Sequence, residues 1–285
     1  MLPHIAWRLD AMVAAVTEHR APLTRPIEQA LRAVPRHWFV PLAGESVERD
    51  GARVPIDRDT DPSAWWDAVY GGRPIMAGQC RCPAPSAVAD LLELLEPVSG
   101  QRVLEVGTGT GWTAALLGRL VGQTGSVTSV EPDAAVAEQA AKNLAAAGAM
   151  PHLVVGDGAA GCPERAPYDG VHVTYAVRIV PYAWVAQARP GAVIVCAFGD
   201  GHALRLVVGP DGTASGRFSA LTTMCAPQDD PPGMALVTEV LGGRGAAQRM
   251  WTIWAEPGPE RFGMTITPKD QRVWLDRPAH VIAKD

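Results

Sequence analysis

Short apolar runs alternate with helical patterns through the middle of the chain. Four of these runs are typical of buried strands, and each leads into glycine or polar residues: 103–106, 126–131, 152–155 and 168–174. Between the first two, residues 114–121 have apolar positions at helical spacing. Because strands that alternate with helices build parallel sheets, the pattern predicts an α/β fold with a Rossmann-like, doubly wound and mostly parallel sheet.

The pattern differs on the N-terminal side of this core. Residues 5–19 and 26–34 are spaced as two amphipathic helices, with Thr24 as a candidate cap between them. The polar, turn-rich stretch 42–72 predicts a lid or a disordered segment. Its paired residues Trp65 and Trp66 favour an ordered lid, a docking surface or simple burial in the core. Residues 87–95 predict a further helix.

Beyond the core, strand patterns dominate. Residues 203–208 and 213–218 predict a hairpin around a Gly-Pro-Asp-Gly turn. Alternating segments at 250–254, 261–267 and 271–276 predict added strands. We therefore divide the chain into an N-terminal segment of helices and substrate loop (1–86), a core (87–225) and a β-rich C-terminal extension (226–285).

The first strand of the core ends in a glycine-rich turn. Residues 105–111 read E-V-G-T-G-T-G, so the backbone turns sharply where a ligand can approach it closely. In a parallel sheet Glu131, at the end of the second strand, lies beside this turn, and an acid there suits two ribose hydroxyls. Asp157, after the third strand, could accept a hydrogen bond from an exocyclic amine, or act only as a turn residue. The sequence therefore predicts a nucleotide-type ligand, although the glycine spacing departs from the dinucleotide pattern.

Composition restricts the function further. The chain has 285 residues, is 47% hydrophobic and carries a net charge of -5, which indicates a packed globular protein and argues against nucleic acid as the main partner. No stretch has the length of a membrane span and the N-terminus lacks the apolar core of a signal peptide, so we expect a cytoplasmic protein without membrane contact. The five cysteines are scattered, which indicates reduced thiols, and the C-x-C of Cys80 and Cys82 lacks the partners of a metal site.

The glycine turn and the acids after the next two strands resemble those of class I S-adenosylmethionine-dependent methyltransferases, whose E-x-G-x-G-x-G turn holds the amino-acid end of the cofactor. Residues 34–41, V-P-R-H-W-F-V-P, could be a simple extended segment that buries Trp38 and Phe39. They also closely resemble V-P-R-x-x-F-V-P of the protein-L-isoaspartate O-methyltransferases. The resemblance runs from about residue 27 to 198. It implies the class I methyltransferase fold, S-adenosyl-L-methionine as cofactor with S-adenosyl-L-homocysteine as product, and a peptide carboxylate as substrate.

The substrate loop departs from that family. Where the family has G-Q-T-I-S-x-P, with a hydroxyl residue beside the substrate carboxylate, this chain keeps Gly78 and Gln79 but is one residue longer and continues as C-R-C. Arg81 could pair with a carboxylate or remain a solvated loop charge. Ser86 could replace the missing hydroxyl or cap the following helix. The departure leaves the identity of the peptide open.

The altered loop, the hairpin and the extension together resemble a branch of the family that acts in peptide maturation. Its members accompany ATP-grasp ligases that make ester- or amide-crosslinked peptides, the graspetides. The resemblance implies methylation of an aspartate side chain in the crosslinked peptide, after which a backbone nitrogen displaces methanol and leaves an aspartimide, with the ligase as a partner. The alternatives are L-isoaspartyl repair of proteins, and a cofactor-binding protein without catalysis that docks on a ligase.

Methyl transfer to a carboxylate needs orientation and exclusion of water rather than a general base, because the carboxylate is ionised at neutral pH. With the resemblance as a guide, we assign roles by position. The residues expected around the reacting carboxylate are Gln79, Cys80, Arg81, Cys82 and Ser86. The residues expected to bind the cofactor are Glu105, Gly107, Thr108, Gly109, Gly111, Trp112, Glu131, Pro132, Gly156, Asp157, Gly158 and Thr174. The residues expected to contact the peptide are Arg36, His37, Tyr175, Arg178 and Tyr182.

Overall fold

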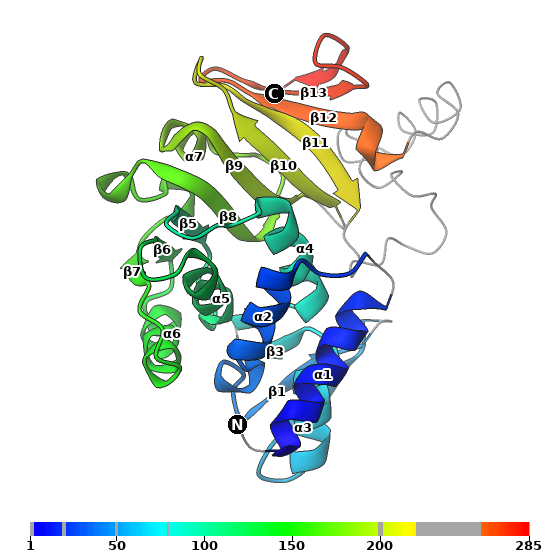
Figure 1. Ribbon diagram of the computed structural model, residues 1–285. Helices are drawn as coiled ribbons and strands as arrows, with labels where there is room; N and C mark the ends of the chain where they lie inside the picture. Colours follow the sequence, from blue (N-terminus) through cyan, green and yellow to red (C-terminus); the bar gives the residue numbers. More distant parts are fainter. Residues whose placement is uncertain are drawn as a thin grey trace.

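A ten-stranded sheet forms the centre of the molecule (Figure 1). The computed structural model describes residues 3–18, 21–48, 51–78, 80–198, 202–220 and 258–284. Parallel strands occupy one end of the sheet, in the order β9 (Ala188–Phe198), β8 (Tyr168–Val177), β5 (Arg102–Val106), β6 (Ser126–Glu131) and β7 (His152–Val155). The four core strands predicted from the sequence are confirmed, and so is the helix after the first, as α5 (Trp112–Val121).

The other end of the sheet is antiparallel and comes from the C-terminal part of the chain. β10 (His202–Val208) and β11 (Ala214–Ala220) form the predicted hairpin. β12 (Phe262–Ile266), β13 (Gln271–Leu275) and β14 (Val281–Lys284) continue the sheet outward. Two of the predicted added strands are thus confirmed, the one at 250–254 lies outside the described residues, and β14 is an addition to the prediction. The sheet is mixed, parallel in the core and antiparallel beyond it.

Helices cover the two faces of the sheet unequally. α4 (Pro85–Leu95) and α5 pack on one face, with α1 (Pro3–Thr17) and α2 (Arg25–Ala33) against them, and an apolar cluster fills this layer. α7 (Tyr182–Ala186) covers the other face, where Trp184 is fully buried. α6 (Ala134–Ala146) contacts β6 and β7, and its first turn is capped by the Asp133 carboxylate. These layers leave the carboxyl ends of the parallel strands for the site.

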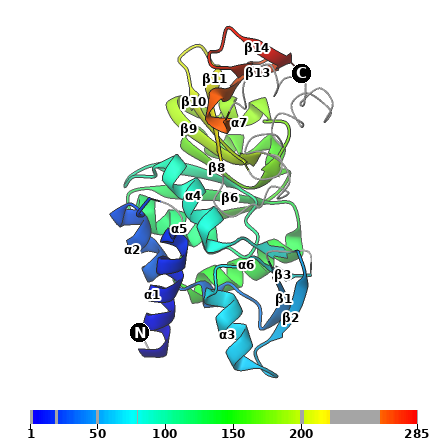
Figure 2. The same ribbon diagram turned by 90° about the vertical axis from the view of Figure 1, so that its right-hand side faces the viewer.

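The N-terminal segment builds a small subdomain with its own antiparallel sheet. The strands lie in the order β2 (Arg53–Asp57), β1 (Ala43–Val47), β3 (Ile75–Ala77) and β4 (Cys80–Cys82), beside α3 (Pro62–Tyr70). Both views place this subdomain at the end of the molecule opposite β11 and β14 (Figure 2). In its described residues, the stretch 42–72 is therefore folded as two paired strands and a helix rather than disordered. Trp65 is a core residue, because it is fully buried and its indole N–H donates to the Pro41 carbonyl at 2.8 Å.

Two expectations for single side chains are wrong, and a third, for Thr24, is confirmed only in its position. Trp38 is 44% exposed, whereas Phe39 is buried, because the segment forms a 3-10 turn, η1 (Arg36–Trp38), instead of running extended. Ser86 lies inside α4 rather than at its cap, since the helix already begins one residue earlier. Thr24 occupies the N-cap position of α2 but its side chain makes no capping hydrogen bond.

The division into three domains stays a prediction. Its first boundary, after residue 86, falls in the first turn of α4, and its second, after residue 225, lies outside the described residues. No helix in the described ranges is both long enough and apolar enough to cross a lipid bilayer.

Candidate cofactor and substrate site

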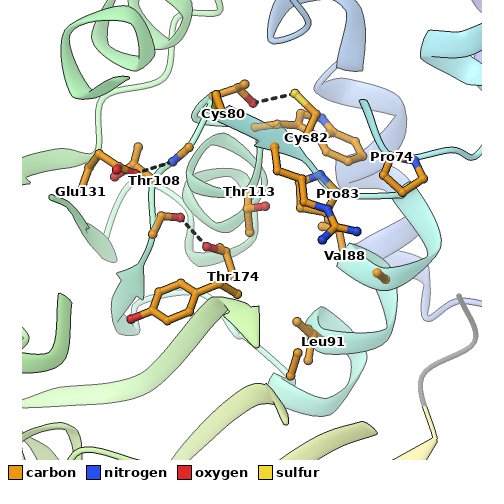
Figure 3. Close-up of a pocket in the computed structure, with 18 of the residues that line it drawn as sticks. Pro74, Cys80, Cys82, Pro83, Val88, Leu91, Thr108, Thr113, Glu131 and Thr174 are labelled. Atoms are coloured by element: carbon orange, nitrogen blue, oxygen red, sulfur yellow. Dashed lines mark hydrogen bonds between the residues drawn. The ribbon is translucent and has the colours of Figure 1, made fainter. Parts of the chain in front are cut away.

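A cavity of about 430 Å³ lies where the carboxyl ends of β5, β6 and β8 meet the small subdomain (Figure 3). The glycine turn and the end of β6 line one side of it, and β4 and α4 line another. The structure brings many of the predicted site residues to this cavity: Arg36, Cys80, Arg81, Cys82, Gly107, Thr108, Gly109, Trp112, Glu131, Pro132, Thr174 and Tyr175. Segments far apart in the sequence thus converge on one candidate site.

The glycine turn leaves its backbone open to the cavity. Gly107 and Gly109 have φ values of +93° and +53°, which favour glycine. A Cβ atom added to Gly107 would lie 2.3 Å from Thr174 Oγ1, which itself donates a hydrogen bond to the Gly107 carbonyl at 2.6 Å. A side chain is therefore excluded at this position, and the turn offers main-chain groups to a ligand. That arrangement fits the amino-acid end of S-adenosylmethionine.

Glu131 lies at the cavity wall beside the glycine turn, where the sheet order predicts it. Its side chain is held in place, because Oε2 accepts a hydrogen bond from Gly109 N at 2.9 Å and Oε1 accepts one from Asp133 N at 3.3 Å. The cavity also has the size of small-molecule sites, which are about 300–1,000 Å³. The residues present therefore fit a nucleoside cofactor with its ribose at Glu131. The ribose contact itself stays a prediction.

Glu105 does not reach the cavity. It is fully buried in β5, where its Oε2 accepts a hydrogen bond from the Ser129 hydroxyl and its Oε1 has no partner in the described part of the chain. Ser129 Oγ lies 2.6 Å from Thr108 Oγ1, so Glu105 supports a residue of the cavity wall rather than forming that wall. Burial raises the pKa of Glu105 to about 8, and the negative charge of Glu131 adds to this.

Replacing Glu105 with glutamine is expected to remove a pH dependence of stability. Because its pKa rises from 4.5 to about 8 on folding, the folded protein keeps a proton that the unfolded chain releases. The stabilising contribution is complete below pH 4.5 and is lost as the pH rises through about 8, by about 1.4 kcal/mol per pH unit. Urea unfolding of the ligand-free protein between about pH 5 and about pH 9 should show this decline in the wild type and not in Glu105→Gln. Parallel profiles would mean that Glu105 is ionised in the folded protein.

The residues predicted to hold the adenine lie outside the cavity lining. Asp157 acts as a turn residue, because its Oδ1 accepts a hydrogen bond from Ala159 N at 2.9 Å at the start of η2 (Gly158–Ala160). Tyr175 lies between this turn and the glycine turn: a Cβ atom on Gly158 would be 3.4 Å from its hydroxyl, and one on Gly107 would be 3.1 Å from its ring. The structure thus places Tyr175, a predicted peptide contact, on the cofactor side. Gly111, at the N-cap of α5, and Gly156 do not line the cavity.

Arg36 is a structural residue as well as part of the cavity lining. Its guanidinium donates to four main-chain carbonyls, of Val69, Arg73, Cys82 and Pro83, at 2.8, 2.9, 3.4 and 2.8 Å. Burial lowers the pKa of Arg36 to about 10, so the side chain is still charged at neutral pH. Arg36 therefore fixes β4 and the end of α3 against the core, and these donors are not available to a substrate.

The remaining predicted peptide contacts lie away from the cavity. His37 Nδ1 lies 2.6 Å from the Tyr70 hydroxyl, in an aromatic group with Trp66. The Tyr182 hydroxyl donates to the Gly212 carbonyl at 2.9 Å, in the turn of the β10–β11 hairpin. Arg178 and Ser86 are not among the residues that line the cavity, and Gln79 lies outside the described residues. Of the described residues, His37, Tyr182, Arg178 and Ser86 therefore do not line the cavity.

The altered loop forms β4, and its three residues all line the cavity. Burial raises the pKa of Cys80 to about 12 and also raises that of Cys82, whose Sγ lies 3.5 Å from Thr110 Oγ1. Both thiols are therefore neutral at physiological pH and do not act as thiolates. The described residues contain no cluster of three or more potential metal ligands, and Cys80, Cys82, Cys162 and Cys196 are free thiols.

Several cavity residues were outside the prediction. Asp133 and Val136 follow Glu131 at the start of α6, and His172 lies on β8 beside Glu105 of β5. Burial lowers the pKa of His172 to about 4, so the imidazole is neutral. Apolar residues of α4, among them Val88 and Leu91, line the far side. Their helical spacing indicates only a buried face, and the sequence carries no signal that this face meets a cavity.

Comparison with known proteins agrees with this geometry. The family model described as protein-L-isoaspartate(D-aspartate) O-methyltransferase matches residues 8–210. Protein-L-isoaspartate O-methyltransferase 2 of Archaeoglobus fulgidus is 36% identical over 196 residues, which are 68% of this chain and 80% of that protein. The protein-L-isoaspartate O-methyltransferase of Thermococcus onnurineus is 40% identical over 178 residues, 62% of this chain and 71% of the relative.

Solved structures show the same fold. A protein-L-isoaspartate O-methyltransferase superposes with a TM-score of 0.67 at 19% identity, over 94% of this chain and 100% of the other. A putative enzyme of this type from Plasmodium falciparum, in complex with S-adenosyl-L-homocysteine, superposes with a TM-score of 0.56 at 11% identity, over 78% and 95%. The fold, the open glycine turn and the family match all point to the same family of methyltransferases. The chain belongs to the protein-L-isoaspartate(D-aspartate) O-methyltransferase family and is an S-adenosylmethionine-dependent carboxyl O-methyltransferase.

Proposed function

We propose that this enzyme methylates a carboxylate on an aspartate-derived residue of a peptide. The supporting observation is that one cavity joins the glycine turn and Glu131 to β4, the segment at which the family pattern has its substrate residue. A cofactor held on one side and a carboxylate held on the other can therefore meet in a single space.

The chemistry depends on positioning. When bound, S-adenosylmethionine supplies a methyl group on a positively charged sulfur, which takes the electron pair of the broken C–S bond and becomes neutral. A substrate carboxylate, with an ordinary pKa of about 3.9, attacks in its ionised form and becomes a neutral ester without any proton transfer. The glycine turn and Glu131 orient one partner, while β4 and α4 orient the other and exclude water. Because the reaction transfers no proton, neither the Cys80 thiol nor the His172 imidazole, which are both neutral, has to act as an acid or a base.

L-isoaspartyl residues of damaged proteins are the substrate that the comparisons support. The relatives are named for that substrate. The family match at residues 8–210 also includes both the V-P-R-H-W-F-V-P segment and β4. In this interpretation the C-R-C sequence is a variation of the substrate loop that the repair reaction tolerates.

An aspartate of a ligase-crosslinked peptide is a second candidate, and two features favour it. β4 carries two neutral thiols and Arg81 where the family pattern has hydroxyls and an apolar residue. The residues after 210 lie outside the family match, yet they contact the segment after β8, since Val180 N donates to Gln271 Oε1 at 3.2 Å. In this interpretation the methyl ester closes to an aspartimide with loss of methanol, and an ATP-grasp ligase supplies the substrate.

Mass spectrometry of three peptides should separate the two substrates. The peptides are an L-isoaspartyl peptide, a ligase-crosslinked precursor peptide and the linear form of that precursor, each incubated with the protein and S-adenosylmethionine. We expect one of them to gain a methyl group. Each peptide has a control in which a carboxamide replaces the reacting carboxylate and the linkage is otherwise unchanged, because an amide cannot accept the methyl group as a carboxylate does.

The pattern of products decides between the candidates. Methylation of the isoaspartyl peptide assigns the protein to repair. Methyl gain followed by methanol loss on the crosslinked peptide alone assigns it to peptide maturation with recognition of a preformed ring. If the protein binds S-adenosylmethionine but methylates none of the peptides, the proposal is wrong and the non-catalytic alternative is favoured.

A further inference from the structure

A shallow groove of about 260 Å³ lies between the segment that follows β8 and the turn that joins β12 to β13. Its apolar lining comes from both sides, with Ile179, Val180 and Tyr182 on one and Ile266 and Pro268 on the other. Ile179 is 59% exposed, although its side chain is large and aliphatic. The turn lies outside the family match, which ends at residue 210. The groove therefore offers apolar surface that methyl transfer itself does not use.

An exposed run of the chain connects the groove to the cofactor cavity. Tyr175 and Ala176 line the cavity. Ile179 and Val180 line the groove, and the residues at positions 175, 176, 178 and 179 are all exposed. Four residues of extended chain span at most about 14 Å. A peptide whose reacting carboxylate lies in the cavity can therefore reach the groove with about five further residues.

Hydrogen bonds hold both walls of the groove in place. Val180 N donates to Gln271 Oε1 at 3.2 Å, which ties one wall to the other. Within the turn, Thr267 N donates to the Asp270 carbonyl at 2.8 Å, and Asp270 N donates to Thr267 Oγ1 at 3.0 Å. The groove is therefore already formed in the free protein.

The turn carries an excess of positive charge. Two cations already balance the Asp270 carboxylate, because Arg272 Nε and Lys284 Nζ each lie 2.9 Å from one of its oxygens. Lys269 is exposed, and it pairs with no acid among the described residues. These four groups together have a net charge of +2, in a protein whose overall charge is -5. Asp270 is also the one acid that lines the groove in the described part of the chain. The turn therefore favours an acidic partner.

We propose that this groove binds the part of the substrate peptide that flanks the methylated residue, and that it selects an apolar residue next to an acidic one. The apolar residue packs on Ile179, and the acid lies toward the turn. This inference rests on the proposed function and deepens it, because it adds a specificity site away from the reacting atoms. Such a site lowers KM and leaves kcat unchanged, because it contributes equally to the binding of the substrate and of the transition state.

The test lengthens the peptide that the wild type methylates. Starting from the shortest version that is still methylated, a Leu-Glu pair is placed about three to six residues from the reacting residue, on either side of it. Each peptide is compared with a Ser-Gln version of the same length. In at least one placement we expect Leu-Glu to lower KM by about 10-fold, through burial of the leucine and attraction of the acid to the turn.

Two variants assign this gain to the groove. Lys269→Glu lowers the net charge of the turn from +2 to zero, and it should abolish the preference of the wild type for Leu-Glu over Leu-Lys at that placement. Ile179→Ser should abolish the preference for Leu-Glu over Ser-Glu. The matched controls are Lys142→Glu on α6 and Val98→Ser, at a side chain that is 57% exposed, and neither residue lines the cavity or the groove. Each KM is divided by that of the shortest peptide, so that a general loss of activity in a variant cancels.

Three results would overturn the inference. One is a wild-type KM that does not depend on the added pair at any placement. Another is a gain from the pair that both variants keep. The third is a change of self-association in Ile179→Ser, measured by sedimentation, without any change in the KM ratios, which would make the groove an interface between copies of this chain. A wild type that methylates none of the peptides contradicts the proposed function itself, whereas an active wild type that is insensitive to the pair contradicts only this inference.

Discussion

Replacing Glu131 with alanine is expected to weaken the binding of S-adenosylmethionine by about 100-fold. The carboxylate lies at the cavity wall, 9% exposed, and its contacts with Gly109 N and Asp133 N fix it in place before a ligand arrives. Hydrogen bonds to a charged group contribute about 1.5–3 kcal/mol each, and 100-fold in Kd corresponds to about 2.7 kcal/mol. Calorimetric titration of both proteins with S-adenosylmethionine measures the difference directly.

A control for this experiment lies on the next helix. Glu138 is an exposed carboxylate of α6 that pairs with Lys142, and Glu138→Ala should leave the cofactor affinity unchanged. Glu131→Gln tests charge separately, because it keeps the size of the side chain and can still accept one hydrogen bond. An unchanged affinity in Glu131→Ala would mean that Glu131 does not bind the ribose and that the nucleoside lies elsewhere.

Replacing Arg36 with methionine is expected to lower the free energy of unfolding by about 3–5 kcal/mol, because each buried acceptor that loses its donor costs about 1–3 kcal/mol. The substitution leaves four main-chain carbonyls without the donor that now joins them. It also removes a guanidinium that lies 5.5 Å from the centre of the Trp112 ring. Because two of these carbonyls belong to Cys82 and Pro83, the position of β4 should be lost together with stability.

Urea unfolding followed by tryptophan fluorescence measures this effect, with Arg119→Met as a surface control. Arg36→Lys should fall between the two, since an ammonium group has three donors and cannot match the geometry of a guanidinium. A loss of less than about 1 kcal/mol in Arg36→Met would mean that water satisfies the four carbonyls, and that Arg36 does not hold β4 in place.

The sequence predicted the strands and the glycine turn of the cavity, because the relevant information is local, while the cofactor contacts themselves stay a prediction. Strand ends and glycines are visible as short patterns, and parallel pairing then places Glu131 beside the glycine turn. The position of the Glu105 side chain was more difficult to predict. Glu105 belongs to the same motif, but the direction of its side chain depends on neighbours such as Ser129 on the next strand. The role of Asp157 was ambiguous for a similar reason, since a turn residue and a residue that binds adenine have the same local sequence pattern.

The substrate half depends on contacts between distant segments, which a single sequence does not reveal. Arg36 was predicted to contact the peptide, yet its partners lie 33 to 47 residues further along the chain. Trp38 was predicted to be buried, but a 3-10 turn exposes it.

The contacts that the β10–β11 hairpin and the C-terminal extension make with the segment after β8 have a consequence for the thermodynamics of peptide binding. The Val180 amide bonds Gln271 and the Tyr182 hydroxyl bonds Gly212, with Ile179, 59% exposed, next to them. Fixing the backbone of one residue costs about 1–2 kcal/mol of conformational entropy. These hydrogen bonds already order the segment in the free protein. Its conformational entropy is therefore lost when the protein folds and not when a peptide binds. Any peptide that docks there meets a preorganised surface and keeps more of its contact energy as affinity.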